Sequence, residues 1–465
     1  MGRCGAAGAR AGHPAALIFA FRALSFERSL RLIFLNRFFH PDHSATSQML
    51  SDLAFALAEQ GNAVCVITSR QRYDAPADTL PPKEVLDGVC VHRVWSTRFG
   101  RVALVGRAID YLTFYLSAAW CLWRLARTGD TVVAKTDPPM LSVTALPVCR
   151  LRGARLVNWL QDIFPETAEA LGVGGPVARV PYRLMRWLRN GSLRAADMNV
   201  VLGERMANRV AALGVRSECI RIIPNWADGG AVAPVEPPAN RMRAEWGLAD
   251  AFVVAYSGNL GRAHAIETLL EAMSLTARQT TPPDPAGKPR PVTWLFIGGG
   301  ALLEPLKIDV VRRGLTSVHF KPYQARGLLA QSLSVADVHL VSLRPELEGL
   351  IVPSKFYGVA AAGRPTIFIG DRNGEIAHIL ARTASGLSIA EGDGRALARA
   401  IMTLAADPAR CTAMGRAARR SFESEFDRPH ALARWQALLH DTAQLRSRTG
   451  RGRPGFRRRR LLDAS

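Results

Sequence analysis

A short stretch in the second half of the chain places acidic residues and a lysine close together. Glu346 and Glu348 come first, followed by Gly349, Ser354 and Lys355. Carboxylates accept hydrogen bonds from sugar hydroxyl groups, and a lysine together with the N–H groups at the start of a helix can bind a phosphate. A sugar and a diphosphate together make a nucleotide sugar. We therefore expect this stretch to bind a nucleotide sugar, unless the two glutamates are merely solvated loop residues.

The same stretch lies between a predicted strand and a predicted helix. The apolar run 338–343 indicates a buried strand, and the small residues from Lys355 to the stop signal at 363–365 indicate a helix. Open α/β sheets bind ligands at the carboxyl ends of their strands, where this loop would lie. A helix dipole disfavours a cation at its N-terminus, and a bound anion would remove that conflict. The position of Lys355 therefore favours a phosphate contact.

Two other loops in the second half combine glycine with polar residues. The loop at 256–264 contains Arg262, which is either a surface arginine or a bidentate phosphate ligand. The glycine run 298–300 is either a tight turn or a close approach for a nucleotide, and its pattern differs from the GxGxxG of NAD enzymes. The donor-binding positions that we predict in these loops are Gly258, Asn259, Gly298 and Gly299.

Polar side chains also follow predicted strands in the first half. Asp162 lies at the end of a nearly apolar segment, where it is either a helix N-cap or a polar group that faces a cleft. Asp137 follows another strand, and Ser44, Thr46 and Ser47 lie near the start of the first predicted helix. Because the carboxyl ends of parallel strands share one edge of a sheet, we expect these residues to face the same cleft.

The order of predicted elements divides the chain into two α/β domains. At 465 residues the chain is too long for one ordinary core. Strands alternate with helical patterns on both sides of a Gly/Pro-rich segment, which predicts two doubly wound sheets around a central cleft. The predicted strands are 31–35, 64–68, 89–94, 131–134, 155–160, 198–201, 220–223, 252–257, 292–297, 318–320, 338–343 and 366–370. The predicted divisions are a basic extension (1–30), a first domain (31–226), a linker (227–240), a second domain (241–425), a crossover helix that returns to the first domain (426–445) and a disordered Arg-rich tail (446–465).

The chain is strongly basic, with a formal net charge of +21. Eight arginines lie in the tail between Arg446 and Arg460. Three interpretations fit this tail: a solvated segment, a segment that contacts an anionic membrane, or a segment that contacts nucleic acid. Nucleic acid is disfavoured because the tail lacks interleaved aromatic residues. We therefore expect no nucleic-acid partner.

The cysteines and the hydrophobic segments indicate a cytoplasmic protein without a spanning helix. The seven cysteines are scattered, with no CxxC and no His/Cys spacing typical of zinc sites, and we expect them to be reduced thiols. Residues 111–125 are rich in Tyr and Trp and have basic flanks, which fits either a core helix or an amphipathic helix at a membrane interface. No apolar run is long enough to predict a transmembrane helix, and the first thirty residues do not resemble a signal peptide.

The segments 257–264, 296–301, 158–166 and 351–358 resemble glycosyltransferase family 4, in the branch that builds bacterial surface polysaccharides such as colanic acid, capsule and O-antigen. The resemblance extends over about residues 31–440. It implies the GT-B fold, two Rossmann-like domains that face a cleft, and a retaining, metal-independent transferase. It also implies that Arg262 contacts the diphosphate, that Tyr323 lies near the nucleotide base, and that Asp162 belongs to the acceptor side.

The chain departs from the family pattern at two positions. Gln161 precedes Asp162 where many members have histidine, and Gly358 occupies the position of the second glutamate of the family signature. No Asp-x-Asp motif is present, so we expect no metal and no other cofactor at the diphosphate.

We predict a glycosyltransferase that uses a UDP- or GDP-sugar and a polyprenyl-diphosphate-linked acceptor at the inner face of the plasma membrane. Its predicted catalytic residues are Asp162, Arg262, Glu348 and Lys355. The alternatives are a nucleotide-sugar 2-epimerase of the same fold and a non-catalytic membrane-bound scaffold.

Overall fold

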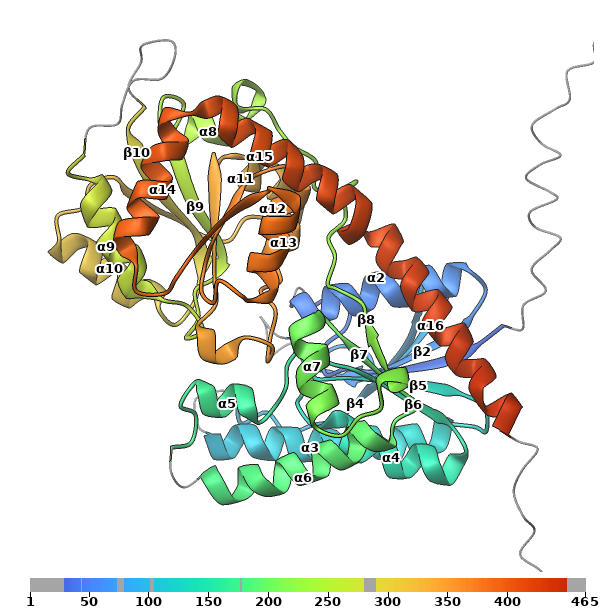
Figure 1. Cartoon of the computed structure of the whole chain (residues 1–465). Coiled ribbons are helices and arrows are strands. Elements are labelled where there is room, and N and C mark those ends of the chain that lie inside the picture. The colour runs from blue at the N-terminus through green and yellow to red at the C-terminus, as the bar shows by residue number, and fades with distance from the viewer. Residues whose placement is uncertain are drawn as a thin grey trace, which may run out of the picture.

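The protein consists of two α/β domains joined side by side (Figure 1). The computed structural model describes residues 29–42, 44–72, 79–100, 104–175, 178–279 and 290–449. The predicted N-terminal extension and the Arg-rich tail lie almost entirely outside the described residues. Two separate sheets, each covered by helices on both faces, confirm the predicted GT-B fold class.

The first domain contains an eight-stranded sheet in the order β3-β4-β2-β1-β5-β6-β7-β8, in which only β3 is antiparallel to its neighbour. Its strands are β1 (Arg31–Leu35), β2 (Ala63–Ser69), β3 (Lys83–Leu86), β4 (Val89–Val94), β5 (Thr131–Lys135), β6 (Arg155–Trp159), β7 (Met198–Val201) and β8 (Ile220–Ile222). Its helices are α2 (Ala45–Glu59), α3 (Leu104–Leu125), α4 (Leu141–Arg152), α5 (Glu166–Ala170), α6 (Arg179–Ala195) and α7 (Glu204–Ala212).

Both faces of this sheet are buried, which explains why its central strands read as continuous apolar runs. Leu32 and Phe34 of β1 pack on the side of α2, whereas Ile33 and Leu35 pack on the side of α3 and α4. Successive strand residues point to opposite faces, so a single run supplies both cores.

The second domain contains a six-stranded parallel sheet in the order β11-β10-β9-β12-β13-β14. Its strands are β9 (Phe252–Asn259), β10 (Val292–Gly299), β11 (Val318–Lys321), β12 (Val338–Ser342), β13 (Thr366–Ile369) and β14 (Gly386–Ile389). Its helices are α8 (Arg241–Glu245), α9 (Ile266–Thr276), α10 (Leu303–Arg312), α11 (Leu329–Ser334), α12 (Lys355–Ala361), α13 (Glu375–Thr383), α14 (Gly394–Ala406) and α15 (Pro408–Ser421).

The C-terminal helix α16 (Arg428–Thr449) leaves the second domain and packs against the first (Figure 1). Trp435 of this helix contacts Trp159 of β6, with ring centroids 4.6 Å apart. The chain crosses between the domains twice, and the crossings lie together: the N–H of Arg428 donates to the carbonyl of Ala227 over 3.0 Å. Asp427 Oδ1 also accepts a hydrogen bond from the N–H of Gly229 over 3.0 Å.

The predicted strands are present, with small differences at their ends, and two further strands appear. β9 and β10 continue two residues beyond their predicted ends, because Gly258 and Asn259 of β9 still pair with Gly298 and Gly299 of β10. The pattern of apolar residues predicts the first helix over 49–58, but α2 begins at Ala45, since the polar residues before Met49 are helical as well. Strands β3 and β14 were missed: β3 is half exposed at an edge, and β14 is short and begins with Gly386.

Residues 111–125 form part of α3, a single helix with one buried and one exposed face. Phe114 and Leu122 are fully buried against the sheet, whereas Leu116 and Trp120 are exposed. None of the helices in the described part of the chain combines the length and apolar character needed to cross a bilayer.

Candidate active site

Each sheet has one position where adjacent strands are followed by connections that run in opposite directions. In the first domain this position lies between β1 and β5, and in the second it lies between β9 and β12. Ligands of open α/β sheets bind beyond the strand ends at such positions. The polar residues predicted from the sequence lie at both places.

In the second domain, Lys355 lies beside the end of β9. Its ammonium group donates a hydrogen bond to the carbonyl oxygen of Asn259 over 2.8 Å and to the hydroxyl of Tyr256. The Nε2 atom of His264 is 3.3 Å away. Lys355 thus connects the loop after β12 to the glycine loop after β9.

The partners of Lys355 are neutral. Burial lowers the pKa of Lys355 to about 7, and no neighbouring carboxylate counteracts this effect. Burial and the nearby Lys355 also lower the pKa of His264 to about 3, so the imidazole is neutral at physiological pH. A half-buried cation without an acidic partner is well placed to bind an anionic ligand.

Glycine at position 258 makes room for the Lys355 side chain. Gly258 has φ of +118°, and a Cβ atom there would lie 2.7 Å from Lys355 Cε. The second glycine loop lies next to it, since Gly298 and Gly299 pair with Gly258 and Asn259 across the sheet.

The side chain of Tyr323 lies over the second glycine loop. Cβ atoms built on Gly298 and Gly299 would each lie 3.1 Å from its ring, and the residue is 62% exposed. Its ring therefore lies beside the glycine loop of the candidate donor site.

Three further predicted donor-site residues lie at the surface. Arg262 and Ser354 are exposed, and Arg262 forms no hydrogen bond or ion pair with another described residue. Glu346 is exposed too, and its Oε2 lies 3.6 Å from Nε of Arg344. The structure thus places Arg262 in the loop between β9 and α9 without fixing its guanidinium group.

Glu348 has a partner that the sequence did not indicate. It is buried, and its Oε1 accepts a hydrogen bond from the N–H of Glu375, the first residue of α13, over 2.8 Å. Burial raises the pKa of Glu348, and the N–H of Glu375 opposes that rise. Its carboxylate therefore caps a helix, and contact with a donor hydroxyl group stays a prediction.

In the first domain, Thr46 and Asp137, which we expected to face the same cleft, are in direct contact. Thr46 Oγ1 donates to Asp137 Oδ2 over 3.0 Å, and the ammonium group of Lys135 donates to the carbonyl of Thr46 over 2.8 Å. Lys135 is only 2% exposed and lies over the ring of Trp159. Burial lowers the pKa of Lys135 to about 7, against the opposing effect of Asp137.

The two serines of this region differ in their contacts. Ser47 is buried and donates to the carbonyl oxygen of Asp42 over 3.1 Å, so its hydroxyl group serves the local turn. Ser44 Oγ is buried without a hydrogen-bond partner in the described part of the chain.

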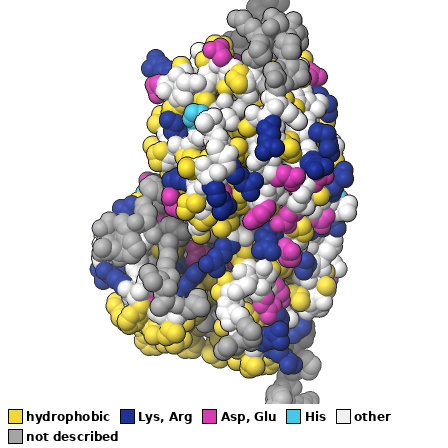
Figure 2. Space-filling view, turned by 90° about the vertical axis from the view of Figure 1, so that its left-hand side faces the viewer, with side chains coloured by type: hydrophobic (Ala, Val, Ile, Leu, Met, Phe, Trp, Pro, Cys, Tyr) yellow, Lys and Arg dark blue, Asp and Glu magenta, His cyan; other side chains and the backbone are white. Residues whose placement is uncertain are grey.

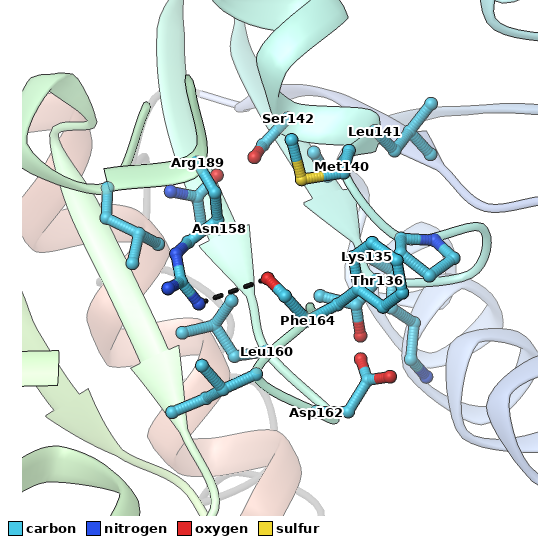
Figure 3. A pocket seen from close by; sticks show the side chains of 14 residues that line it. Lys135, Thr136, Met140, Leu141, Ser142, Asn158, Leu160, Asp162, Phe164 and Arg189 are labelled. Atoms are coloured by element: carbon cyan, nitrogen blue, oxygen red, sulfur yellow. Dashed lines mark hydrogen bonds between the residues drawn. The ribbon is translucent and has the colours of Figure 1, made fainter. Parts of the chain in front are cut away.

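Asp162 lines a pocket between β5, β6, α4 and α6 (Figure 3). Its carboxylate points toward Thr136, and its Oδ1 atom is buried without a hydrogen-bond partner among the described residues. Burial raises the pKa of Asp162 to about 6, a hydrogen bond with Thr136 lowers it, and Asp137 raises it further. An acceptor oxygen without a donor is therefore present on the first-domain side of the site.

The wall of this pocket depends on Arg189 of α6, which the sequence did not single out. Arg189 is buried, donates to the carbonyl oxygen of Phe164 over 3.2 Å (Figure 3), and pairs with Glu166 over 2.6 Å. An arginine within an Arg-rich amphipathic helix carries no sequence signal that separates it from its exposed neighbours.

The two domains meet next to Asp162. Ile163 N–H donates to the carbonyl of Leu350 over 2.9 Å, and Asp162 forms an antiparallel bridge with Ile351. Ile351 belongs to the loop that leads into Lys355. The main chain thus joins the segment that carries Asp162 to the segment that carries Lys355.

Gly349 allows a second contact between the domains. Its φ is +73°, and a Cβ atom there would lie 2.8 Å from Arg209 Nε. This nitrogen donates to the carbonyl of Glu348 over 2.9 Å, so a side chain at position 349 would disturb the contact.

Two family models match the chain, one in each domain. The "Glycosyl transferase 4-like domain" matches residues 45–226, and "Glycosyl transferases group 1" matches residues 251–407. Together the two models span most of both sheets.

Curated relatives and solved structures agree with these matches. The chain is 31% identical to glycosyltransferase WbjE of Pseudomonas aeruginosa over 283 residues, which are 59% of this chain and 66% of the relative. It is 24% identical to the colanic acid biosynthesis glycosyl transferase WcaI of Escherichia coli K12 over 371 residues, 76% of this chain and 86% of the relative. The structure of HepE from Anabaena in complex with UDP and glucose shares the fold, with a TM-score of 0.64 and 17% identity over 89% of this chain and 100% of HepE.

Proposed function

Because this chain belongs to the family 4 glycosyltransferases, we propose that it transfers a sugar from a UDP- or GDP-sugar to a polyprenyl-diphosphate-linked acceptor in surface-polysaccharide synthesis. The observation that carries this proposal is the half-buried ammonium group of Lys355, which has neutral partners beside the glycine loops. A diphosphate would supply the missing negative charge. The complex of HepE with UDP and glucose supports a nucleotide-sugar donor in this fold.

The proposed reaction retains the anomeric configuration and uses side-chain cations rather than a metal at the leaving diphosphate. Lys355 stabilises the negative charge that builds as the sugar departs, and Arg262 joins it from the adjacent loop. Asp162 orients the acceptor hydroxyl group or the reacting sugar from the opposite domain. Contact between the domains next to Asp162 keeps water from the reacting bond.

A ligand panel followed by a product assay tests this proposal. Thermal unfolding is measured with UDP, GDP and their common sugar conjugates, and one nucleoside diphosphate is expected to raise Tm. Its sugar conjugate should be consumed in the presence of EDTA only when a polyprenyl-diphosphate-linked acceptor is added. A change of the sugar with donor alone would indicate the 2-epimerase, and no response to either nucleotide would contradict the proposal.

The proposed place of the reaction is the inner membrane surface, and the outer face of α3 supports it. Large apolar side chains lie exposed along this helix at helical spacing: Val105, Ile109, Leu112, Leu116, Trp120 and Trp123. The helix contains one acidic residue, Asp110, which is buried and accepts a hydrogen bond from Thr97. The exposed face therefore combines apolar and aromatic groups with the basic residues Arg107 and Arg124.

Helix α6 extends this face, although its sequence was not singled out. Val180, Leu184, Trp187 and Leu188 are exposed on it, and its sequence contains no acidic residue. Helix α4 packs against both α3 and α6, so the three helices form one layer under the sheet. Figure 2 shows hydrophobic side chains gathered along the lower rim of the molecule, in the domain that Figure 1 places at the bottom.

Removal of two exposed tryptophans should release the protein from membranes. The change Trp120→Ser with Trp187→Ser, at side chains 63% and 68% exposed, is expected to weaken binding to phosphatidylglycerol vesicles at least tenfold, since each buried indole contributes about 2 kcal/mol. Ile308→Ser with Val311→Ser on α10 is the matched control, because these side chains are equally exposed on the second domain. Vesicle sedimentation measures the membrane binding of both variants. Equal binding by the two would refute the proposal that this surface contacts the membrane. Turnover of a water-soluble acceptor should be unchanged in both.

A further inference from the structure

Three potential metal ligands meet on two neighbouring strands near one edge of the first sheet, away from the carboxyl ends of the strands. Cys65 lies on β2, and Cys90 and His92 lie on the neighbouring β4, where Cys65 is directly opposite Cys90. Their ligand atoms lie within 4.8 Å of one another, and Cys90 Sγ is 3.4 Å from His92 Nε2. No other group of three such residues with this proximity occurs in the described part of the chain.

A third thiol approaches from helix α3. Cys121 of α3 packs against the core cluster that contains Cys65 and Cys90. Cys90 and Cys121 are close enough to raise the pKa of Cys65, and Cys90 also raises the pKa of Cys121, in each case in addition to the larger effect of burial.

Three thiols and an imidazole are a donor set that suits Zn²⁺. Zinc in structural sites prefers tetrahedral Cys3His or Cys2His2 coordination, with Zn–S distances of about 2.3 Å. Tetrahedral geometry places sulfur ligands about 3.8 Å apart, so Cys65, Cys90 and His92 need only about 1 Å of contraction. Cys65 is buried, whereas Cys90, Cys121 and His92 are half-buried, which leaves a route for an ion from solvent.

We propose that Cys65, Cys90 and His92 bind a zinc-type divalent ion, with Cys121 as the fourth ligand. The ion would join β2, β4 and α3, and would thereby fasten the helix that carries the exposed apolar face to the edge of the sheet. The sequence spacing gives no hint of this group, because the four residues come from three elements and span 56 positions, from Cys65 to Cys121.

Cobalt titration of the full-length, reduced and metal-stripped protein tests the proposal. Co²⁺ is expected to bind at 1:1 stoichiometry with a thiolate-to-cobalt charge-transfer band and the visible spectrum of tetrahedral Co²⁺, and Zn²⁺ should displace it. Cys65→Ser with Cys90→Ser should abolish the band. Cys219→Ser with Cys411→Ser, which removes two buried thiols elsewhere, should leave the band unchanged. Cys121→Ser should weaken binding by about 10-fold or more, as lost metal contacts do.

His92→Ala keeps the test decisive if the double cysteine variant fails to fold, because His92 is half-buried at the sheet edge. A folded His92→Ala protein that binds Co²⁺ as tightly as the wild type would overturn the proposal. The proposal would also fail if the reduced wild type lacked the thiolate band, or if mass spectrometry showed Cys65 and Cys90 joined as a disulfide in protein that had bound Co²⁺.

Discussion

Replacement of Lys355 by alanine is expected to lower kcat/KM by about 100- to 1000-fold, the usual effect of removing one group that stabilises charge in a transition state. The ammonium group has neutral partners, so its loss should not break an ion pair and should leave Tm close to that of the wild type. Steady-state kinetics with saturating acceptor measures the effect. The half-buried Lys307 on α10, changed to alanine, serves as the control and should retain full activity.

Lys355 should also make donor binding depend on pH. Since burial places its pKa near 7, the side chain is charged below about pH 7 and loses its charge as the pH rises. Donor affinity is therefore expected to fall above pH 7, by at most about tenfold per pH unit. Lys355→Arg should remove this dependence, because arginine stays charged. A Lys355→Ala enzyme with wild-type kinetics would rule out the diphosphate role.

Replacement of Asp162 by asparagine is expected to lower kcat by about 100-fold, as the loss of a group that orients a reactant does. Its Oδ1 atom is a free acceptor in the pocket, and asparagine would remove the charge while preserving the shape. Donor-induced shifts in Tm should be unchanged, because the donor residues lie on the other domain. Since the pKa of Asp162 is about 6, wild-type kcat should fall as the pH drops below 6 and the carboxylate takes up a proton.

The control for this variant is Asp309→Asn on α10, whose side chain pairs with Arg312 in the second domain. It should keep wild-type kcat and the wild-type pH profile. An Asp162→Asn enzyme that turns over normally at saturating substrate, or one that loses its donor-induced shift in Tm, would contradict a role confined to the first-domain side.

The sheets were predictable because their central strands are apolar runs that fill two cores at once. The placement of Lys355 near the glycine loop was also predictable, since strand ends at a change of connection direction meet in space. Its partners Tyr256 and His264 were not, because they depend on the pairing of β9 with β12 across about eighty residues. The order of strands in the whole sheet brings Tyr256 and His264 close to Lys355, and the local sequence pattern does not reveal that order.

The contact made by the Glu348 carboxylate could not be predicted from the sequence. Glu348 reads as a ligand in a polar loop, yet it is buried and caps α13, whose first N–H lies 27 residues further along the chain. Sequence spacing cannot reveal such a cap, because the loop and the helix are brought together by β13 between them. Arg189 shows the same limitation on the first domain: only the folded α6 separates this buried residue from its exposed neighbours.

The main-chain bridge between Asp162 and Ile351 has a consequence for how this enzyme can diverge. Backbone groups of one domain hold backbone groups of the other, so the spacing between the proposed donor and acceptor sites does not rely on which side chains occupy positions 350 and 351. Those positions can drift during evolution, and new sugar preferences can arise around them, while the two reactants stay aligned.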